Sequence, residues 1–230
     1  MKEGIISPIE SMPVHFVKFS TIILFCAGII LLVFPVSWFP SFYDVRYMGF
    51  VGLAYAVLIT FLPRLLRVSE NETDAARKNH AADLFQFLLI FVFISNVAGD
   101  LGLYKLYTVG FEFDKLLHLI IPFTSVIVIS IILNQRFRIR KYYAIAMAFG
   151  FIILCGVVWE VYEYATDIIL KTHISGVYGL GISIDTKFDL IYDVFGSVFG
   201  VLGGVFFWNP LVPQLKEVTM VKRSYKTRGR

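Results

Sequence analysis

Cysteine and histidine are scarce in this sequence. The chain of 230 residues holds two cysteines, Cys26 and Cys155, and both fall within apolar segments. Two such cysteines exclude a disulfide framework and a cysteine-based zinc motif, so we expect them to be packing residues. Four histidines leave little material for a histidine-rich intramembrane hydrolase. The sequence also contains no G-x-S-x-G elbow, P-loop or H-E-x-x-H motif.

Apolar residues, in contrast, are abundant. Hydrophobic residues make up 57% and aromatic residues 17% of the chain, and the mean hydropathy is +0.74. These values are too high for a soluble domain of this size. We therefore predict an all-α, polytopic membrane protein in which residues 1–230 form a single integral membrane domain. Its expected partners are membrane lipids, and no nucleic acid is expected.

The apolar residues are grouped in six stretches long enough to cross a bilayer. At about 1.5 Å per residue, each can span roughly 30 Å of hydrocarbon. They predict six transmembrane helices in one bundle, near residues 19–40, 47–66, 82–103, 114–134, 142–168 and 187–208. The first run is longer than a signal-peptide core, so we expect it to remain as an anchor.

Lysine and arginine are distributed unevenly between the two ends of these spans. The connection at 64–78, the loop at 135–141 and the segment at 209–230 are all basic, whereas the opposite connections carry few basic residues. Because basic loops are retained on the cytoplasmic side, this pattern predicts that both termini are cytoplasmic and that 209–230 is a basic cytoplasmic tail. The expected location is the plasma (inner) membrane.

Acidic residues gather at the opposite, outer end of spans four, five and six. Span four begins with Asp114 and carries His118 one turn later, and the others follow in spans five and six: Glu160, Glu163, Asp185, Asp189 and Asp193. At about 100° per residue, the acids within each span share one helix face. Gly156 lies on that face in span five, and Gly196 and Gly200 lie on it in span six. Small residues let membrane helices approach closely, so we expect these glycines to be packing positions and the acids to face one another.

Several carboxylates brought together need either protons or a cation among them. An ionised acid within a span costs about 2.5–3.5 kcal/mol on insertion scales, which makes the deeper Glu160 and Asp193 the strongest candidates for a functional site. Carboxylates and a histidine suit a divalent metal ion. The predicted ligands are Asp114, His118, Glu160, Glu163, Asp189 and Asp193, with Glu160 or His118 as general base. Helix capping by Asp114 and Asp185 is the plainer alternative.

The order of three segments, "DKLLH", "EVYE" and "DTKFDLIYDVFGSVFG", resembles the YjdF-like family of small bacterial membrane proteins, and more loosely VanZ-like proteins. The resemblance covers about residues 110–204. It implies the same candidate positions but no activity. In the VanZ-like pattern, glutamine and asparagine are expected at the positions where this chain has Glu163 and Asp189 or Asp193.

Two classes of function remain compatible with these features. The first is a membrane-embedded, metal-dependent hydrolase or transferase, or a binding protein, that acts on a lipid or lipid-linked substrate from the outer side. The second is a component of a proton- or cation-coupled transporter or channel. An accessory protein with a structural cation is a third possibility. Few polar residues continue below the acidic layer and no inverted repeat is evident, which favours the first class.

Overall fold

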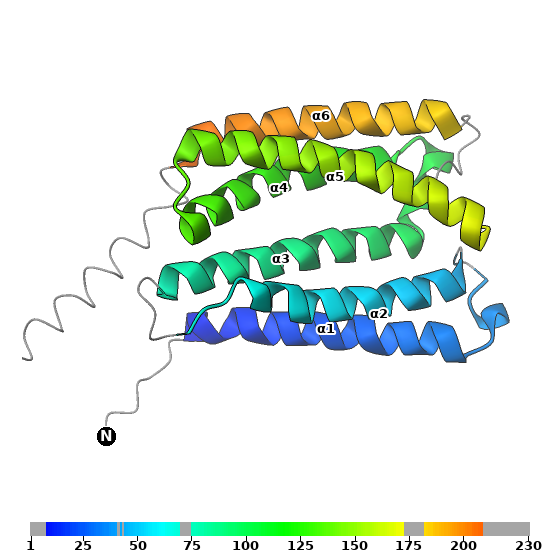
Figure 1. Ribbon diagram of the computed structural model, residues 1–230. Helices are drawn as coiled ribbons and strands as arrows, with labels where there is room; N and C mark the ends of the chain where they lie inside the picture. The colour runs from blue at the N-terminus through cyan, green and yellow to red at the C-terminus, as the bar shows by residue number, and fades with distance from the viewer. Residues whose placement is uncertain (1–7, 41, 43, 70–74, 173–181, 209–230) are drawn as a thin grey trace, which may run out of the picture.

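Six long helices make up most of the structure (Figure 1), a computed structural model that describes residues 8–40, 42, 44–69, 75–172 and 182–208. Their bounds are α1 Pro8–Val33, α2 Val45–Phe61, α3 Ala75–Asp100, α4 Phe113–Phe137, α5 Lys141–Leu170 and α6 Ile182–Phe206. Short 3₁₀ helices follow α1, α2 and α3, at Val36–Trp38, Leu62–Leu65 and Leu103–Val109. Within the described ranges, every element of regular secondary structure is a helix.

All six long helices are long and apolar enough to cross a membrane. The candidate spans are His15–Val33, Val45–Leu65, Arg77–Asp100, Phe113–Phe137, Lys141–Leu170 and Ile184–Phe206. Successive helices run in opposite directions, so the chain crosses the bundle six times (Figure 1). The prediction of an all-α protein with six membrane-spanning helices is confirmed.

Several helix ends differ from the predicted ones. The span predicted at 19–40 is wrong at its end, because α1 stops at Val33, two residues before Pro35. Proline disfavours a helical conformation in the residue before it, and Pro35 and Pro40 bracket a short 3₁₀ turn instead. Capping by Asp114 and Asp185 is also wrong, since Glu112 holds the cap position of α4 and Asp185 lies inside the first turn of α6.

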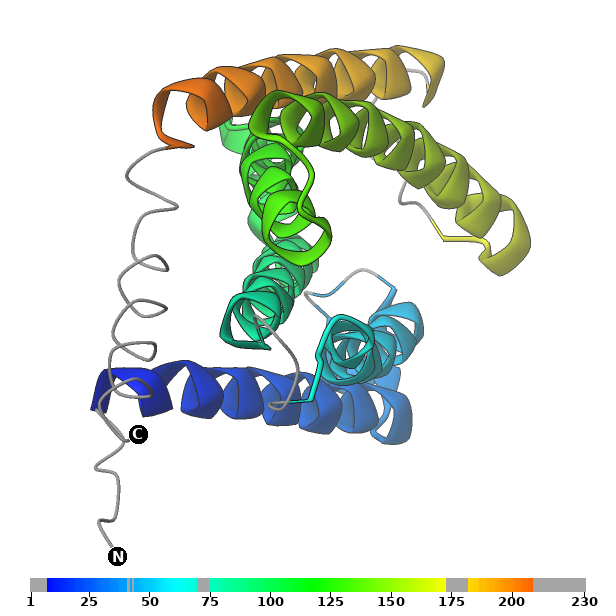
Figure 2. The same ribbon diagram turned by 60° about the vertical axis from the view of Figure 1, so that its left-hand side comes forward.

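Helix α4 has a central position in the bundle. It packs against α3, α5 and α6, while α1 packs mainly against α2. Figures 1 and 2 show α5 and α6 on one side of α4, with α3, α2 and α1 on the other. The residues that face inward from α4 therefore lie next to three other helices.

The contact between α4 and α6 is close because of glycine. A Cβ atom added to Gly196 would collide with the backbone carbonyl of Leu119, and one added to Gly200 would meet the carbonyl of Phe123. At these two positions the backbone of α4 occupies the space that a side chain would need. The face of α6 that carries Gly196 and Gly200 is thus turned toward α4, and the aspartates of α6 lie on that same face.

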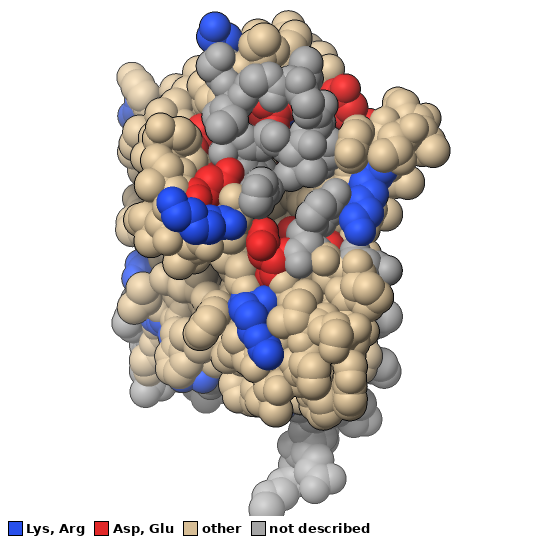
Figure 3. All heavy atoms as spheres, turned by 90° about the vertical axis from the view of Figure 1, so that its right-hand side faces the viewer, with Lys and Arg blue, Asp and Glu red and all other residues tan. Residues whose placement is uncertain are grey.

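The acidic residues lie at one end of the bundle, where α3 and α5 end and α4 and α6 begin. Figure 3 looks onto this end and shows Asp and Glu side chains gathered among the helix ends, with basic side chains nearby. Residues 173–181, between α5 and α6, and the predicted basic tail at 209–230 lie outside the described residues.

Candidate functional site

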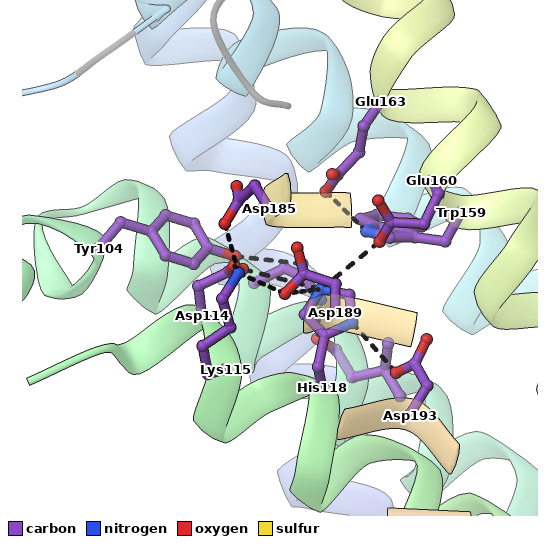
Figure 4. Close-up of polar contacts among 12 residues, drawn as sticks. Tyr104, Asp114, Lys115, His118, Trp159, Glu160, Glu163, Asp185, Asp189 and Asp193 are labelled. Atoms are coloured by element: carbon purple, nitrogen blue, oxygen red, sulfur yellow. Dashed lines mark hydrogen bonds and ion pairs between the residues drawn. The ribbon is translucent and has the colours of Figure 1, made fainter. Parts of the chain in front are cut away.

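The acidic side chains of three helices point toward one another near the beginning of α4 (Figure 4). The i, i+4 spacing of the aspartates on α6 and the i, i+3 spacing of the glutamates on α5 place each set on one helix face. Most of these side chains are buried within the bundle. The cluster consists of Asp114, Lys115 and His118 from α4, Glu160 and Glu163 from α5, and Asp185, Asp189 and Asp193 from α6.

Lys115 supplies a positive charge inside this cluster. Its Nζ lies 2.5 Å from Asp185 Oδ1, 2.6 Å from Asp189 Oδ1 and 3.3 Å from Asp114 Oδ2. The Lys115 side chain is only 7% exposed. Lys115 is not among the site residues predicted from the sequence. The signal that points to it is a lysine within an apolar span, which membranes tolerate when it is paired.

His118 lies at the centre of the deeper part of the cluster. Its Nδ1 is 3.0 Å from Asp193 Oδ1. A carboxylate accepts hydrogen bonds, so this contact assigns the ring proton to Nδ1 and leaves the Nε2 lone pair free in neutral imidazole. A carboxylate that orients a histidine in this way is the usual outer partner of a metal-binding histidine.

The other ring nitrogen of His118 faces three carboxylates from three helices. Nε2 lies 3.8 Å from Asp114 Oδ1, 3.8 Å from Asp189 Oδ1 and 3.9 Å from Glu160 Oε1. These separations exceed hydrogen-bond length. Two ligands that each bind one zinc ion at about 2.1 Å are roughly 3.4 Å apart in tetrahedral geometry, so the observed spacing is close to that of atoms sharing an ion.

The donor set of Asp114, His118 and Asp189 fits a metal ion. Each offers one ligand atom, and these atoms lie within 4.8 Å of one another. Glu160 lies beside them with a side chain only 6% exposed. Its Oε1 has no hydrogen-bond partner among the described residues. A buried carboxylate oxygen without a donor is costly, so this atom requires either a proton or a cation.

The remaining predicted residues have other surroundings. Asp193 contacts the Nδ1 side of His118, opposite the three carboxylates that face Nε2. Glu163 accepts a hydrogen bond of 2.7 Å from Trp159 Nε1. Gly156 faces Asp193, because a Cβ at this position would collide with the aspartate carboxylate. The structure therefore brings Asp114, His118, Glu160 and Asp189 together and places Asp193 and Glu163 around them.

A cavity of about 270 Å³ extends from this cluster between α3, α4 and α5. Its polar end is lined by Asp114, His118, Trp159, Glu163 and Asp193, and the rest of its wall is mostly apolar. An outer-facing acidic pocket among spans four, five and six is predicted from the sequence; the apolar extension of this cavity between α3 and α5 is not, since it depends on how far these two helices stand apart.

Tyr104, from the 3₁₀ segment after α3, closes the polar end of the cavity. Its hydroxyl lies 3.4 Å from Asn96 Oδ1 as a hydrogen-bond donor, and its ring lies against Gly99, where a side chain would collide with it. Burial, reinforced by Asp114 and other acidic groups, holds the pKa of Tyr104 well above its usual value. Tyr104 therefore remains a neutral phenol.

Comparison with known proteins places this chain among predicted membrane proteins. An uncharacterized protein of Thermotoga maritima is 33% identical over 127 residues, which cover 52% of this chain and 63% of that relative. No solved structure matches the chain. The family of predicted membrane proteins DUF2238 matches residues 22–209, which include all of the clustered acidic residues. Since the match covers most of the sequence, the chain belongs to this family.

Proposed function

We propose that the outer end of the bundle binds a divalent cation and that the protein is a membrane-embedded, metal-dependent hydrolase or transferase acting on a lipid or lipid-linked substrate. The observation that carries this proposal is the setting of His118. Asp193 holds one ring nitrogen at 3.0 Å, and the other nitrogen faces three carboxylate oxygens from three helices at 3.8–3.9 Å.

The charge of the cluster supports a bound cation. Five of its six carboxyl groups lie within 4 Å of Lys115 Nζ or a ring nitrogen of His118, and these five carry five negative charges when ionised, against one positive charge on Lys115 when His118 is neutral. The low dielectric of the membrane interior strengthens the repulsion between them. A divalent ion would offset two of these charges. The five residues are Asp114, Glu160, Asp185, Asp189 and Asp193.

Each residue has a distinct role in this proposal. Asp114, His118 and Asp189 supply the ligand atoms, and Asp193 orients the His118 ring. A catalytic metal site keeps one position open, and Glu160 Oε1, which has no donor among the described residues, faces that position as the general base. A divalent ion bound there would polarise a phosphoryl or acyl oxygen and lower the pKa of a bound water.

The surroundings of the site favour a substrate that comes from the bilayer. The adjoining cavity has mostly apolar walls and lies between membrane-spanning helices. A lipid or lipid-linked molecule would enter from the outer leaflet if the acidic end faces outward, as the basic segments at the other end indicate. We propose the plasma membrane as the location, with both termini cytoplasmic.

The likeness to YjdF-like proteins is part of this proposal. The segment that carries it, residues 110–204, lies within the range that matches the DUF2238 family, so the two assignments are compatible. The segment contains every residue of the proposed cation site.

The proposal is tested by the effect of metal on thermal unfolding in detergent. Magnesium, manganese and zinc are added one at a time to chelator-treated protein, and the shift in unfolding temperature is measured for each variant against its own metal-free baseline. An ion at 100 times its Kd stabilises by about 2.7 kcal/mol. We expect His118→Asn and Asp189→Asn to lose the shift. Glu160→Gln should keep most of it, because Glu160 faces the open position.

The control is Asp167→Asn, also on α5. Asp167 accepts a hydrogen bond from Thr172 at 2.7 Å and lies outside the His118 group, so its variant should respond to metal like the wild type. A wild type that responds to none of the three metals would contradict the proposal. If Glu160→Gln also abolished the response, the site would have four protein ligands and no open position, which describes a structural cation in an accessory protein.

A component of a proton- or cation-coupled transporter or channel is the second candidate. The observation in its favour is Lys115, which already pairs with Asp185 and Asp189 without any metal. A cluster of this kind could exchange protons between its carboxyl groups and His118. The same experiment separates the two, because a protonated cluster would be insensitive to chelator and would be stabilised by Glu160→Gln at neutral pH.

A further inference from the structure

Asp193 lines the cavity, and one of its two carboxylate oxygens has no partner among the described residues. Oδ1 is engaged by His118 at 3.0 Å. Oδ2 is buried and has no hydrogen-bond donor among the described residues. The Asp193 side chain is only 7% exposed, and it contributes to the wall of the cavity. A buried anionic oxygen without a donor is costly, and a donor from a bound molecule would offset that cost.

Gly156 makes room for this oxygen at the cavity wall. Its position on α5 lies directly against Asp193 Oδ2, and a Cβ there would collide with it. Gly156 also lines the cavity. The Asp193 carboxylate therefore occupies the space that a side chain at this position would need, and it reaches the cavity wall beside Gly156.

The cavity is polar at one end and apolar at the other along all three helices that form it. On α5 the lining changes from Glu163 and Trp159 to Ile152 and Phe151. On α4 it changes from Asp114 and His118 to Ile121 and Ile129, and on α3 from Asn96 to Leu89 and Phe85. The apolar end lies deeper in the bundle. An amphiphile would fit with its headgroup at the acidic end and its chain directed toward the middle of the membrane.

The size and opening of the cavity suit one hydrocarbon chain. Its volume of about 270 Å³ is near the lower end of ligand pockets, which are usually about 300–1,000 Å³. Phe151 and Cys155 line it and are exposed at the surface of α5. A chain can therefore enter from the surrounding lipid between α3 and α5.

The charge at the polar end selects the headgroup. Three acids, Asp114, Glu163 and Asp193, line the cavity, with His118 as the only basic side chain among its lining residues in the described part of the chain. Lys115 is turned instead to Asp185 and Asp189. The aromatic rings of Trp159 and Tyr104 complete the wall, and such rings attract cations. Without a bound metal ion, an anionic headgroup would be repelled by this arrangement.

We propose that this cavity binds one hydrocarbon chain of an amphiphile whose headgroup carries a primary ammonium group, with an ammonium N–H donating to Asp193 Oδ2. The chemical class includes long-chain amines and aminolipids. The proposal goes beyond the divalent-cation site and does not require it, because the oxygen that it uses is not the one that contacts His118.

The test is photo-crosslinking with a long-chain primary amine that carries a diazirine at the far end of its chain. Purified full-length protein in a non-ionic detergent is irradiated in the presence of chelator, and the labelled residues are mapped by mass spectrometry. Label is expected on the deep lining residues of the cavity, such as Phe85, Ile129 and Phe151. Label spread evenly over the lipid-exposed faces of all six helices would overturn the proposal.

Competition with unlabelled compounds of the same chain length tests the headgroup. Dodecylamine should displace the probe at a concentration about tenfold or more below that of dodecanol, since a hydrogen bond to a charged group contributes about 1.5–3 kcal/mol. Dodecyl phosphate should compete poorly, dodecyltrimethylammonium should fall between because it lacks an N–H donor, and ethanolamine should not compete. Equal competition by the alcohol or the phosphate would overturn the assignment of an ammonium group.

Two variants with a matched control complete the experiment. Cys155→Trp fills the cavity at an exposed position and should abolish specific labelling, whereas the neighbouring Leu154→Trp, at a position 61% exposed and outside the cavity lining, should label like the wild type. Asp193→Asn should reduce the preference for amine over alcohol.

Because Cys155→Trp leaves the metal ligands in place, its thermal response to metal should persist, so failure of the ammonium proposal is distinguishable from failure of the cation site. Unchanged labelling of Cys155→Trp would contradict the proposal.

Discussion

At the scale of single residues, Lys115 explains how so many acids lie together in the bundle. It contacts carboxylates from α4 and α6 at once. Removing one partner of a buried ion pair leaves the others uncompensated, and this typically costs about 3–5 kcal/mol. We therefore expect Lys115→Met to destabilise the protein by several kcal/mol, measured as unfolding by SDS in mixed micelles.

Lys187→Met is the matched control for this prediction. Lys187 is an exposed lysine on α6, close in sequence to the same aspartates, and its removal should change stability by well under 1 kcal/mol. Similar losses from the two variants would show that the Lys115 ion pairs contribute little.

Tyr104 gives a prediction about pH. Its pKa lies well above the usual value in the folded protein because of burial, whereas in the unfolded chain it returns to about 10. A raised pKa in the folded state means that this contribution to stability is present below about pH 10 and is lost as the pH rises above it. Tyr104→Phe should therefore lose less stability than the wild type between neutral pH and pH values above 10. Stability is measured by thermal unfolding at each pH. Equal losses of stability in the wild type and in Tyr104→Phe would be inconsistent with a buried phenol.

The chemistry of the cluster was predictable from sequence only in part. Helical periodicity is enough to place His118, Glu160 and the aspartates of α6 on inward faces, because charged groups avoid lipid. It does not tell which ring nitrogen of His118 meets which acid, since that depends on the rotation of α6 against α4. Lys115 was missed because a topology rule treats a lysine near a span end as part of a loop.

At the scale of helices, glycine determines how closely α4 and α6 approach. Gly196→Ala adds a methyl group where Leu119 backbone atoms already lie, and overpacking of this kind costs about 1–3 kcal/mol. Gly150 on α5 is the control, because a Cβ there meets nothing within 4 Å. Gly150→Ala should be neutral or slightly stabilising, by up to about 1 kcal/mol through helix propensity. The two variants are compared by unfolding in SDS, and equal effects would contradict the close approach.

Helix ends were the least predictable feature at this scale. Hydropathy places the first span across Pro35, but the chain leaves the helix at Val33 because proline restricts the residue before it. At the other extreme, α3 begins at Ala75, seven residues before the predicted span, because polar residues such as Arg77 and Lys78 continue a helix beyond the hydrocarbon. Hydropathy locates the segment that lies in the hydrocarbon, whereas the residues at which a helix begins and ends depend on local helix propensity.

At the scale of the whole molecule, the number of spans fixes the relation between the two ends of the bundle. Six antiparallel helices put the beginning of α1 and the end of α6 at the same end (Figure 1). Chain fusions to a reporter that is active only outside the cytoplasm should be inactive after Arg140 and active after Thr172. Activity at both points, or at neither, would show that α5 does not cross the membrane.

The ion pairs between α4 and α6 also have a consequence for how the protein is made. Among the six described spans, α6 has the lowest mean hydropathy, 1.5 against 2.6 for α4, and it carries three buried aspartates. Such a segment partitions poorly into lipid by itself. Since α4 is synthesised first, Lys115 is already present when α6 leaves the ribosome. We expect α6 to enter the bilayer as a partner of α4, so that truncated chains lacking α4 would leave it outside the membrane.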